Sequence, residues 1–119
     1  MNNYQNSKRF DLEERTYEFA KNCRDYVKNL PKTISNFEYG KQLIRSSGSQ
    51  AANYIEANEA LSKKDFVHRI KISKKETKES ILWLKLIISY KNNEDDKERL
   101  IKEAIELMKI FGSIFHKSK

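Results

Sequence analysis

Lysines recur along one stretch of the chain at a spacing that could bind a polyanion. Four of them follow one another at seven-residue intervals, and two more lie between these four. The six residues are Lys64, Lys71, Lys74, Lys75, Lys78 and Lys85. Seven residues of helix rise about 10 Å and return to nearly the same side, so the lysines form a row. Such a row suits a ligand whose negative charges also repeat, such as a nucleic-acid backbone.

The excess positive charge of the whole chain is concentrated in this stretch. The 119 residues carry 24 Lys and Arg against 17 Asp and Glu, a net charge of +7. Residues 63–91 hold nine basic and three acidic side chains, so +6 of that charge is theirs. Few aromatic residues are interleaved, and any nucleic acid would therefore be held by its phosphates. The same pattern also fits a solvated helix face without a ligand, or a face for acidic proteins or lipids.

Other residue combinations that could do chemistry are incomplete. A di-metal bundle needs Glu-x-x-His on each of two helices, and the chain offers only Asp65 with His68 at that spacing. We therefore expect no metal and no cofactor. Glu76 and Glu79 have ordinary spacing for a solvated face, and we expect them to pair with nearby lysines such as Lys75.

The single cysteine, Cys23, falls on an apolar helix face, where burial is a better explanation than reactivity. No catalytic residues are expected, and the chain is predicted not to be an enzyme.

Composition indicates helices that position these residues. The chain has three glycines and one proline, which argues against folds rich in tight turns. Apolar residues recur at helical spacing over residues 11–30, 36–60, 63–91 and 94–116. Asp11 and Ser62 are predicted N-caps, and Asn92 and Asn93 offer the cap of the fourth helix. Polar residues on the inward faces predict a hydrogen-bonded network, with a substrate site as the alternative; they are Ser47, Asn58, Ser73, Thr77 and Ser80.

Short connections predict one all-α domain over residues 1–119, an antiparallel up-down-up-down four-helix bundle. On the second helix, Gly40, Leu43, Ile44, Gly48 and Ile55 are among the residues expected to point inward, with the glycines allowing close packing. No secretory signal and no membrane-length apolar segment is visible, so a cytoplasmic protein without membrane contact is expected.

The end of the third helix carries more apolar residues than one bundle needs. Leu82, Trp83, Leu86 and Ile87 extend around the helix and predict a homo-oligomer interface. The alternative is a wider intramolecular core in which Trp83 packs on an adjacent helix.

Three segments together resemble a known family. They are FDLEERTYEFA, LPKTISNFEYGKQLIRSSGSQAANYIEANEALSKKDF and HRIKISKKETKESILWLKLI. They are similar to the four-helix bundle proteins grouped with the 23S ribosomal RNA intervening-sequence proteins, which include accessory variability proteins of diversity-generating retroelements. The resemblance implies a ring-shaped homopentamer with a basic surface that associates with nucleic acid and a reverse transcriptase. It brings no catalytic residues. Its recurrent positions here are Gln42, Leu43, Arg45, Ser46, Ser49, Asn53, Glu56, Phe66 and Glu79.

The sequence thus predicts a non-enzymatic oligomer that binds RNA or DNA through the lysine row. A protein interaction scaffold that never touches nucleic acid is the alternative.

Overall fold

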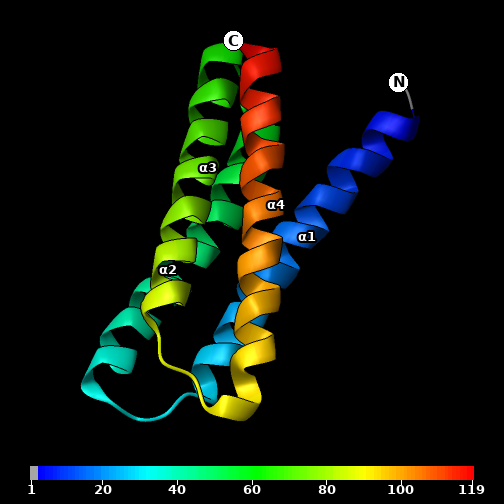
Figure 1. Ribbon diagram of the computed structural model, residues 1–119. Helices are drawn as coiled ribbons and strands as arrows, with labels where there is room; N and C mark the ends of the chain where they lie inside the picture. Colours follow the sequence, from blue (N-terminus) through cyan, green and yellow to red (C-terminus); the bar gives the residue numbers. More distant parts are fainter. Residues whose placement is uncertain (1–2) are drawn as a thin grey trace.

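Four long helices make up nearly all of the chain (Figure 1). The computed structural model describes the backbone of residues 3–119 and the side chains of residues 11–119. The helices are α1 (Asn3–Lys28), α2 (Ile34–Asn58), α3 (Lys63–Leu86) and α4 (Glu94–Ser118), with a short 3₁₀ helix η1 (Lys91–Asn93) before α4. Residues 3–119 contain no strand, so the prediction of an all-helical chain with four helices is confirmed.

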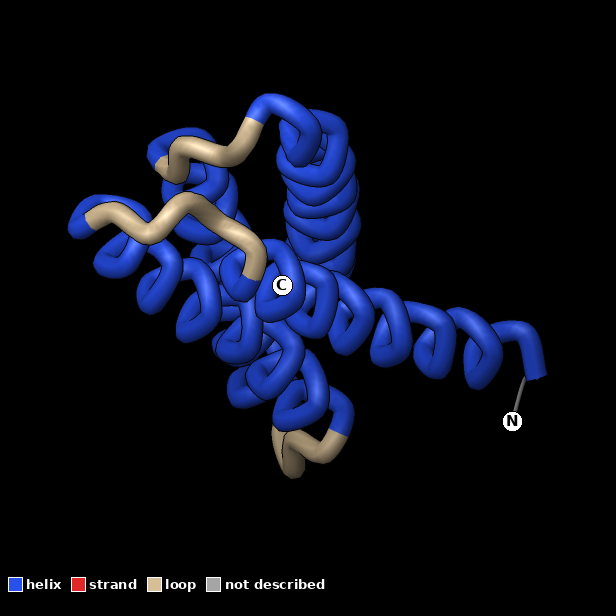
Figure 2. Tube along the Cα trace, turned by 90° about the horizontal axis from the view of Figure 1, so that it is seen from below, coloured by secondary structure: helices blue, strands red, loops and turns tan. Residues whose placement is uncertain are grey.

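The helices are arranged so that α3 lies between α2 and α4. The α1–α2 and α3–α4 connections lie at one end, and the α2–α3 connection lies at the other end with the C-terminus (Figure 1). The N-terminal turns of α1 extend away from the other three helices (Figure 2). Contact of α1 is therefore mainly with α2, and α4 rests mainly on α3.

The core is built from the faces that the helical spacing predicts on α1 and α4. Leu12, Thr16, Phe19 and Cys23 are buried on α1 at intervals of three and four residues. On α4 the buried positions include Leu100, Ala104, Leu107 and Phe111. These two apolar faces are therefore confirmed.

The inward face of α2 differs from the prediction. Ile44 and Ile55, expected inside, are 45% and 50% exposed. Buried instead are Asn36, Gly40, Leu43, Ser46, Ser47, Gln50, Tyr54 and Ala57. Relative to the prediction, α2 is rotated about its own axis. Its small and polar side chains face inward because they form hydrogen bonds to α1 and α3, which isoleucine side chains could not form. The predicted inward orientation of Ile44 and Ile55 is therefore wrong.

The two glycines of α2 have different surroundings. A Cβ on Gly40 would lie 2.9 Å from Val27 Cγ1 of α1, so close helix packing explains this glycine. A Cβ on Gly48 would have no atom within 4 Å. Packing within one chain therefore gives no reason for Gly48.

The helix ends show which predicted caps form. Ser62 caps α3, since its Oγ accepts a hydrogen bond from the Asp65 N–H at 3.0 Å, as predicted. Asp11 lies inside α1 and is not a cap, because α1 begins at Asn3. Asn93 precedes α4 without a side-chain capping bond, and Thr33 caps α2 with an acceptor bond from Asn36 N–H.

The third helix is shorter than the predicted range 63–91, because α3 ends at Leu86 and Ile87 is extended. Buried Asn36 of α2 holds the next residue: its Nδ2 donates to Ile88 O at 2.7 Å, and Ile88 N–H donates to Asn36 Oδ1 at 2.9 Å. The same Nδ2 donates to Pro31 O at 3.0 Å. One amide thus joins both connections at this end of the molecule.

We predict that Asn36→Ala lowers the free energy of unfolding by about 2–4 kcal/mol, because buried backbone groups lose their partners. Urea unfolding followed by circular dichroism measures the change. Asn29→Ala is the matched control, since its exposed side chain makes one local bond to Asp25 O and should cost about 0.5 kcal/mol or less. Equal losses in the two variants would contradict the role given to Asn36.

Candidate nucleic-acid interface

The predicted lysine row lies along the outer side of α3. Lys64, Lys71, Lys75, Lys78 and Lys85 are exposed, and only Lys74 is half-buried. Lys74 crosses toward α4, where its Cε lies 3.7 Å from the place of a Cβ on Gly112. The helix therefore presents five of the six predicted lysines to solvent.

The acidic residues of α3 are not partners of these lysines. Arg45 of α2 binds two of the acidic residues: its Nη1 donates to Glu76 Oε2 and its Nη2 donates to Glu79 Oε1, each at 2.9 Å. Asp65 lies 3.8 Å from Arg69 Nε. The predicted pairing of Glu76 and Glu79 with lysines such as Lys75 is wrong. Arg45 reaches both carboxylates from the facing helix, and Glu76 is buried beside it.

The six lysines of the row form a basic face, which we name the lysine face, and no acidic side chain that the structure describes neutralises it. None of the six lysines forms an ion pair with the side chains of residues 11–119. Their ammonium groups are therefore balanced by solvent and counterions, which an incoming phosphate backbone could replace.

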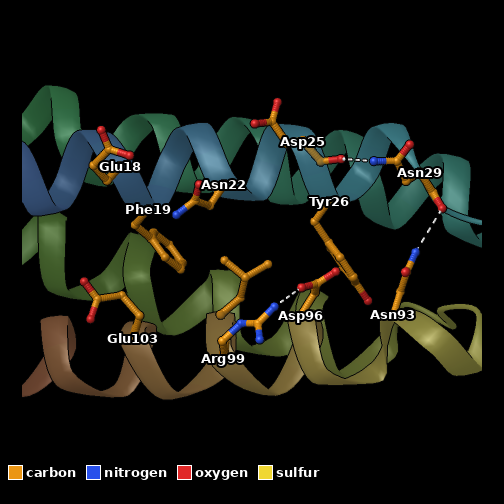
Figure 3. Close-up of a pocket in the computed structure, with 11 residues that line it drawn as sticks. Glu18, Phe19, Asn22, Asp25, Tyr26, Asn29, Asn93, Asp96, Arg99 and Glu103 are labelled. Carbon is orange, nitrogen blue, oxygen red and sulfur yellow. Dashed lines mark hydrogen bonds and ion pairs between the residues drawn. The ribbon is translucent and has the colours of Figure 1, made fainter.

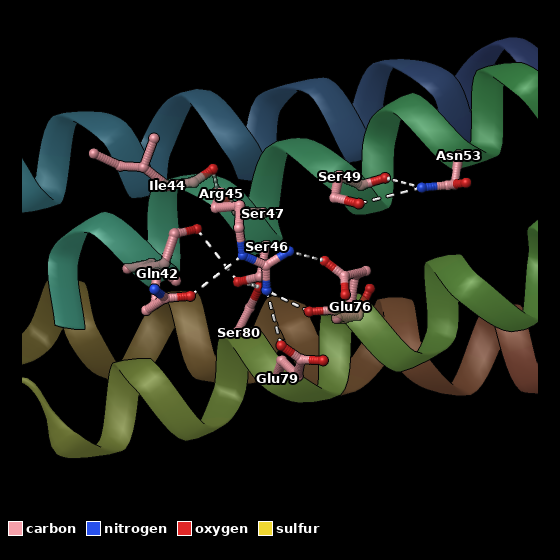
Figure 4. Close-up of polar contacts among 12 residues, drawn as sticks. Gln42, Ile44, Arg45, Ser46, Ser47, Ser49, Asn53, Glu76, Glu79 and Ser80 are labelled. Carbon is pink, nitrogen blue, oxygen red and sulfur yellow. Dashed lines mark hydrogen bonds and ion pairs between the residues drawn. The ribbon is translucent and has the colours of Figure 1, made fainter. Parts of the chain in front are cut away.

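A line of polar contacts between α2 and α3 fixes the rotation of α3 (Figure 4). Ser46 and Ser80 hydroxyls lie 2.7 Å apart, and Ser73 Oγ donates to Gln50 O at 3.0 Å. Further along, Arg69 Nη1 donates to Asn53 Oδ1 at 3.1 Å. Because these groups face α2, the lysines on the opposite side of α3 face outward.

The predicted polar network is therefore confirmed as hydrogen bonds. Besides Ser73 and Ser80, Thr77 Oγ1 donates to Ser73 O of its own helix at 2.8 Å. Ser47 Oγ donates to Ile44 O, and Asn58 Nδ2 donates to Glu13 Oε1 of α1.

The predicted oligomer residues divide into two groups. Leu82 and Leu86 are 48% and 41% exposed and form what we name the α3 apolar patch. Ile87 is fully buried in the core, which corrects its assignment to an interface: the chain leaves the helix there and turns this side chain inward. Trp83 stacks on Tyr39 of α2 with ring centroids 5.9 Å apart, so it packs on the adjacent helix.

The α3 apolar patch belongs to the same side of the helix as the lysines. At about 100° per residue, Leu82 lies about 40° from Lys78 and about 60° from Lys85 around the axis. One outer face of α3 is thus basic over most of its length and apolar at its C-terminal end.

A polar cleft of about 600 Å³ separates α1 from α4 (Figure 3). Its lining contains the carboxylates of Glu18, Asp25, Asp96 and Glu103. Three of them are bound by arginines: Arg24 pairs with Asp25, Arg99 with Asp96, and Arg15 with Glu103 at 2.6 Å. These pairs neutralise most of the acidic charge, so the cleft is a poorer candidate site than the lysine face.

Burial defines the state of Cys23. Its side chain is fully enclosed, and desolvation raises the pKa of the thiol to about 12. Residues 11–119 bring no three His, Cys, Asp or Glu side chains together in a way that could hold a metal ion. Within residues 3–119, no helix is long and apolar enough to cross a membrane.

The comparisons with known proteins agree with the resemblance seen in the sequence. The family model described as 23S rRNA-intervening sequence protein matches residues 8–113. The chain belongs to this family. No curated protein matches.

A solved structure shares the fold of this member of the 23S rRNA-intervening sequence family. It is a protein of unknown function from the S23 ribosomal protein family of Bacteroides thetaiotaomicron VPI-5482. The two chains are 27% identical, with a TM-score of 0.74, and the match covers 87% of this chain and 97% of the other. The similarity therefore extends over nearly the whole family domain.

Arg45 is the site residue whose role the sequence did not indicate. Its position beside Gln42 and Ser49 on a face of small polar residues was a usable signal, because an arginine there needs a carboxylate on the facing helix.

We predict that Cys23 reacts with a disulfide reagent at pH 8 only when urea unfolds the protein, because the native thiol is enclosed and protonated. Folding stability should also fall from about pH 9 upward, since the unfolded thiol ionises near 9.0 while the native thiol stays protonated up to about 12. Cys23→Ala should lose this part of the pH dependence. Complete labelling of native protein within seconds would contradict the burial of Cys23.

Proposed function

We propose that this protein is a non-enzymatic, oligomeric accessory protein that binds nucleic acid through the lysine face of α3. The observation that carries the proposal is the separation of charges on α3. All three carboxylates of α3 lie beside arginines, while the six lysines of the row have no acidic partner among residues 11–119. When such a face binds a polyanion, its ammonium groups replace counterions condensed on the polyanion, and the release of these counterions into solution favours binding.

RNA is the first ligand to test, and DNA is the second. The family description names a 23S rRNA-intervening sequence, and the solved relative is assigned to an S23 ribosomal protein family. The lysine face offers ammonium groups and few aromatic rings, so it would follow backbone charge and shape more than base sequence. The resemblance to accessory proteins of diversity-generating retroelements suggests a reverse transcriptase as a protein partner. We place the protein in the cytoplasm.

We further infer that the chain is an antiparallel up-down-up-down four-helix bundle whose copies assemble into a ring, by resemblance a pentamer. The alternating ends at which the connections lie support the bundle. The α3 apolar patch supports assembly, because two half-exposed leucines on one face lose contact with water when a second copy covers them. A ring would also repeat the lysine face and increase avidity.

An interaction scaffold without nucleic acid is the second candidate. It is favoured by the exposed apolar side chains of α2, among them Phe37 at 65% exposure, which the nucleic-acid proposal does not use. A scaffold should keep its protein partner after nuclease treatment, whereas a nucleic-acid-bridged complex should lose it.

The lysine face is tested by replacing Lys64, Lys71 and Lys78 with Glu. If each subunit neutralises about four phosphates, log affinity against log salt should have a slope of about −3 to −4 for the native protein. The triple variant should lose about 3 from the magnitude of that slope, because three phosphate contacts are removed. Fluorescence anisotropy with a labelled RNA duplex and its DNA counterpart measures both affinities over a salt series.

The matched control changes the same charge elsewhere. Lys102, Lys109 and Lys117 are exposed on α4, and their replacement with Glu should leave the slope within about 1 of the native value. Binding that is insensitive to salt, or equal losses in the two triple variants, would overturn the proposed interface.

We predict that Leu82→Asp with Leu86→Asp reduces the native assembly to single chains of 14.1 kDa, because two charges would be buried at the contact. Light scattering after size exclusion measures the mass. Leu61→Asp is the control, since Leu61 is fully exposed at the α2–α3 connection, away from the patch, and should leave the mass unchanged. A native protein of single-chain mass would refute the assembly.

A further inference from the structure

The outer side of α2 carries a second apolar face that the core does not use. We name it the α2 outer face, and it consists of Phe37, Ile44, Gly48 and Ile55. At about 100° per residue, the four positions lie within about 40° of one another and extend over about 27 Å of helix. The three large side chains are 45–65% exposed, so this row of apolar side chains faces solvent in the single chain, with the Lys41 ammonium 4.9 Å from the Phe37 ring centroid.

Gly48 lies in the middle of this face and is not explained by the single chain. A glycine inside a helix costs about 1 kcal/mol relative to alanine. At Gly40 close packing on Val27 explains the glycine, but a Cβ on Gly48 would meet open space. A bare helix surface at this point allows the side chains of another molecule to approach the backbone closely.

A groove extends the α2 outer face toward α1. It has a volume of about 820 Å³, and Val27, Pro31, Ile34, Phe37 and Ile44 contribute its apolar walls. The α2 outer face is therefore concave at its N-terminal end.

The α2 outer face and the α3 apolar patch differ in size and lie on different helices. If the patch met its own copy across a two-fold axis, the α2 outer face would stay in water. A contact between the two different surfaces is of the head-to-tail kind, which forms a ring when the rotation between copies closes, and in a ring both surfaces are covered in every copy.

At the Ile55 end of the α2 outer face, the neighbouring charges are opposite in sign to the charge beside the α3 apolar patch. Lys85 lies beside Leu82 and Leu86, and Glu56 and Glu59 lie beside Ile55. All three charged residues are exposed, and none forms an ion pair with the side chains of residues 11–119. Opposite charges at the rim would select this pairing over contact between two like patches.

We propose that the α2 outer face receives the α3 apolar patch of a second copy, head to tail, with Lys85 at the rim facing Glu56 and Glu59. This inference rests on the homo-oligomer of the proposed function and adds which surface each copy offers its neighbour.

The test mixes two variants, each damaged on one surface. The face variant carries Ile44→Asp and Ile55→Asp, and the patch variant carries Leu82→Asp and Leu86→Asp. Each variant alone should have single-chain mass by light scattering, with native helicity by circular dichroism. Their equimolar mixture should form a two-chain complex, because one intact face and one intact patch remain. Tyr17→Asp, at an exposed position of α1, should keep the native mass.

Gly48→Leu is a second variant, in which misfolding could not explain a loss of association. The Cβ of the new side chain meets no atom within 4 Å in the single chain, and leucine has a better helix propensity than glycine, so the unfolding midpoint should not fall. The association constant should nevertheless fall at least about tenfold, since the side chain blocks close approach.

The outcomes separate this inference from the proposed function. A face variant or Gly48→Leu protein that keeps native mass and affinity overturns the head-to-tail contact and leaves the oligomer standing. A mixture that stays at single-chain mass also overturns it. A native protein of single-chain mass overturns the oligomer itself, and the lysine variants still decide nucleic-acid binding independently.

Discussion

The guanidinium of Arg45 binds two carboxylates of α3, and the charge pattern of the outer surface depends on this contact. A buried Glu76 without a cation would be costly, so Arg45 both fastens α2 to α3 and holds two of the three acids of α3 away from the lysines. If Glu79 had turned outward instead, it would lie four residues from Lys75, a spacing at which two side chains pair on a helix surface. The basic face would then be a mixed one with little attraction for phosphates.

Helix positions and most of the core could be predicted, because they follow from local periodicity. Leu12, Phe19 and Cys23 on α1 and Leu107 and Phe111 on α4 repeat at helical spacing, and all are buried. The end of α3 could not be predicted from local pattern. The apolar run continues beyond Leu86, but the chain leaves the helix because Asn36, fifty-two residues away, binds the backbone of Ile88. The sequence of α3 alone gives no indication of a contact with a residue so distant in the chain.

The predicted rotation of α2 is wrong for a related reason. Its apolar and small polar residues form two overlapping faces, and hydrophobicity alone favours Ile44 and Ile55 as the buried set. Hydrogen bonding decides otherwise, because Ser46 reaches Ser80 and Gln50 Nε2 reaches Thr16 O. Of the candidate site, the lysine positions were predictable from a seven-residue repeat. That Glu76 and Glu79 in particular would be the partners of Arg45 was not, because it depends on which helices become neighbours.

Trp83 gives the protein an optical label at the edge of the surface where copies are proposed to meet. It is the single tryptophan of the chain, it stacks on Tyr39, and its indole Nε1 has no hydrogen-bond partner among residues 11–119. Indole emission depends on the polarity around the ring, so the fluorescence of the unmodified protein reports how far water is excluded from the surface around Trp83. The dissociation of an assembly on dilution can therefore be followed by the emission wavelength of Trp83, without any dye attached to the subunits.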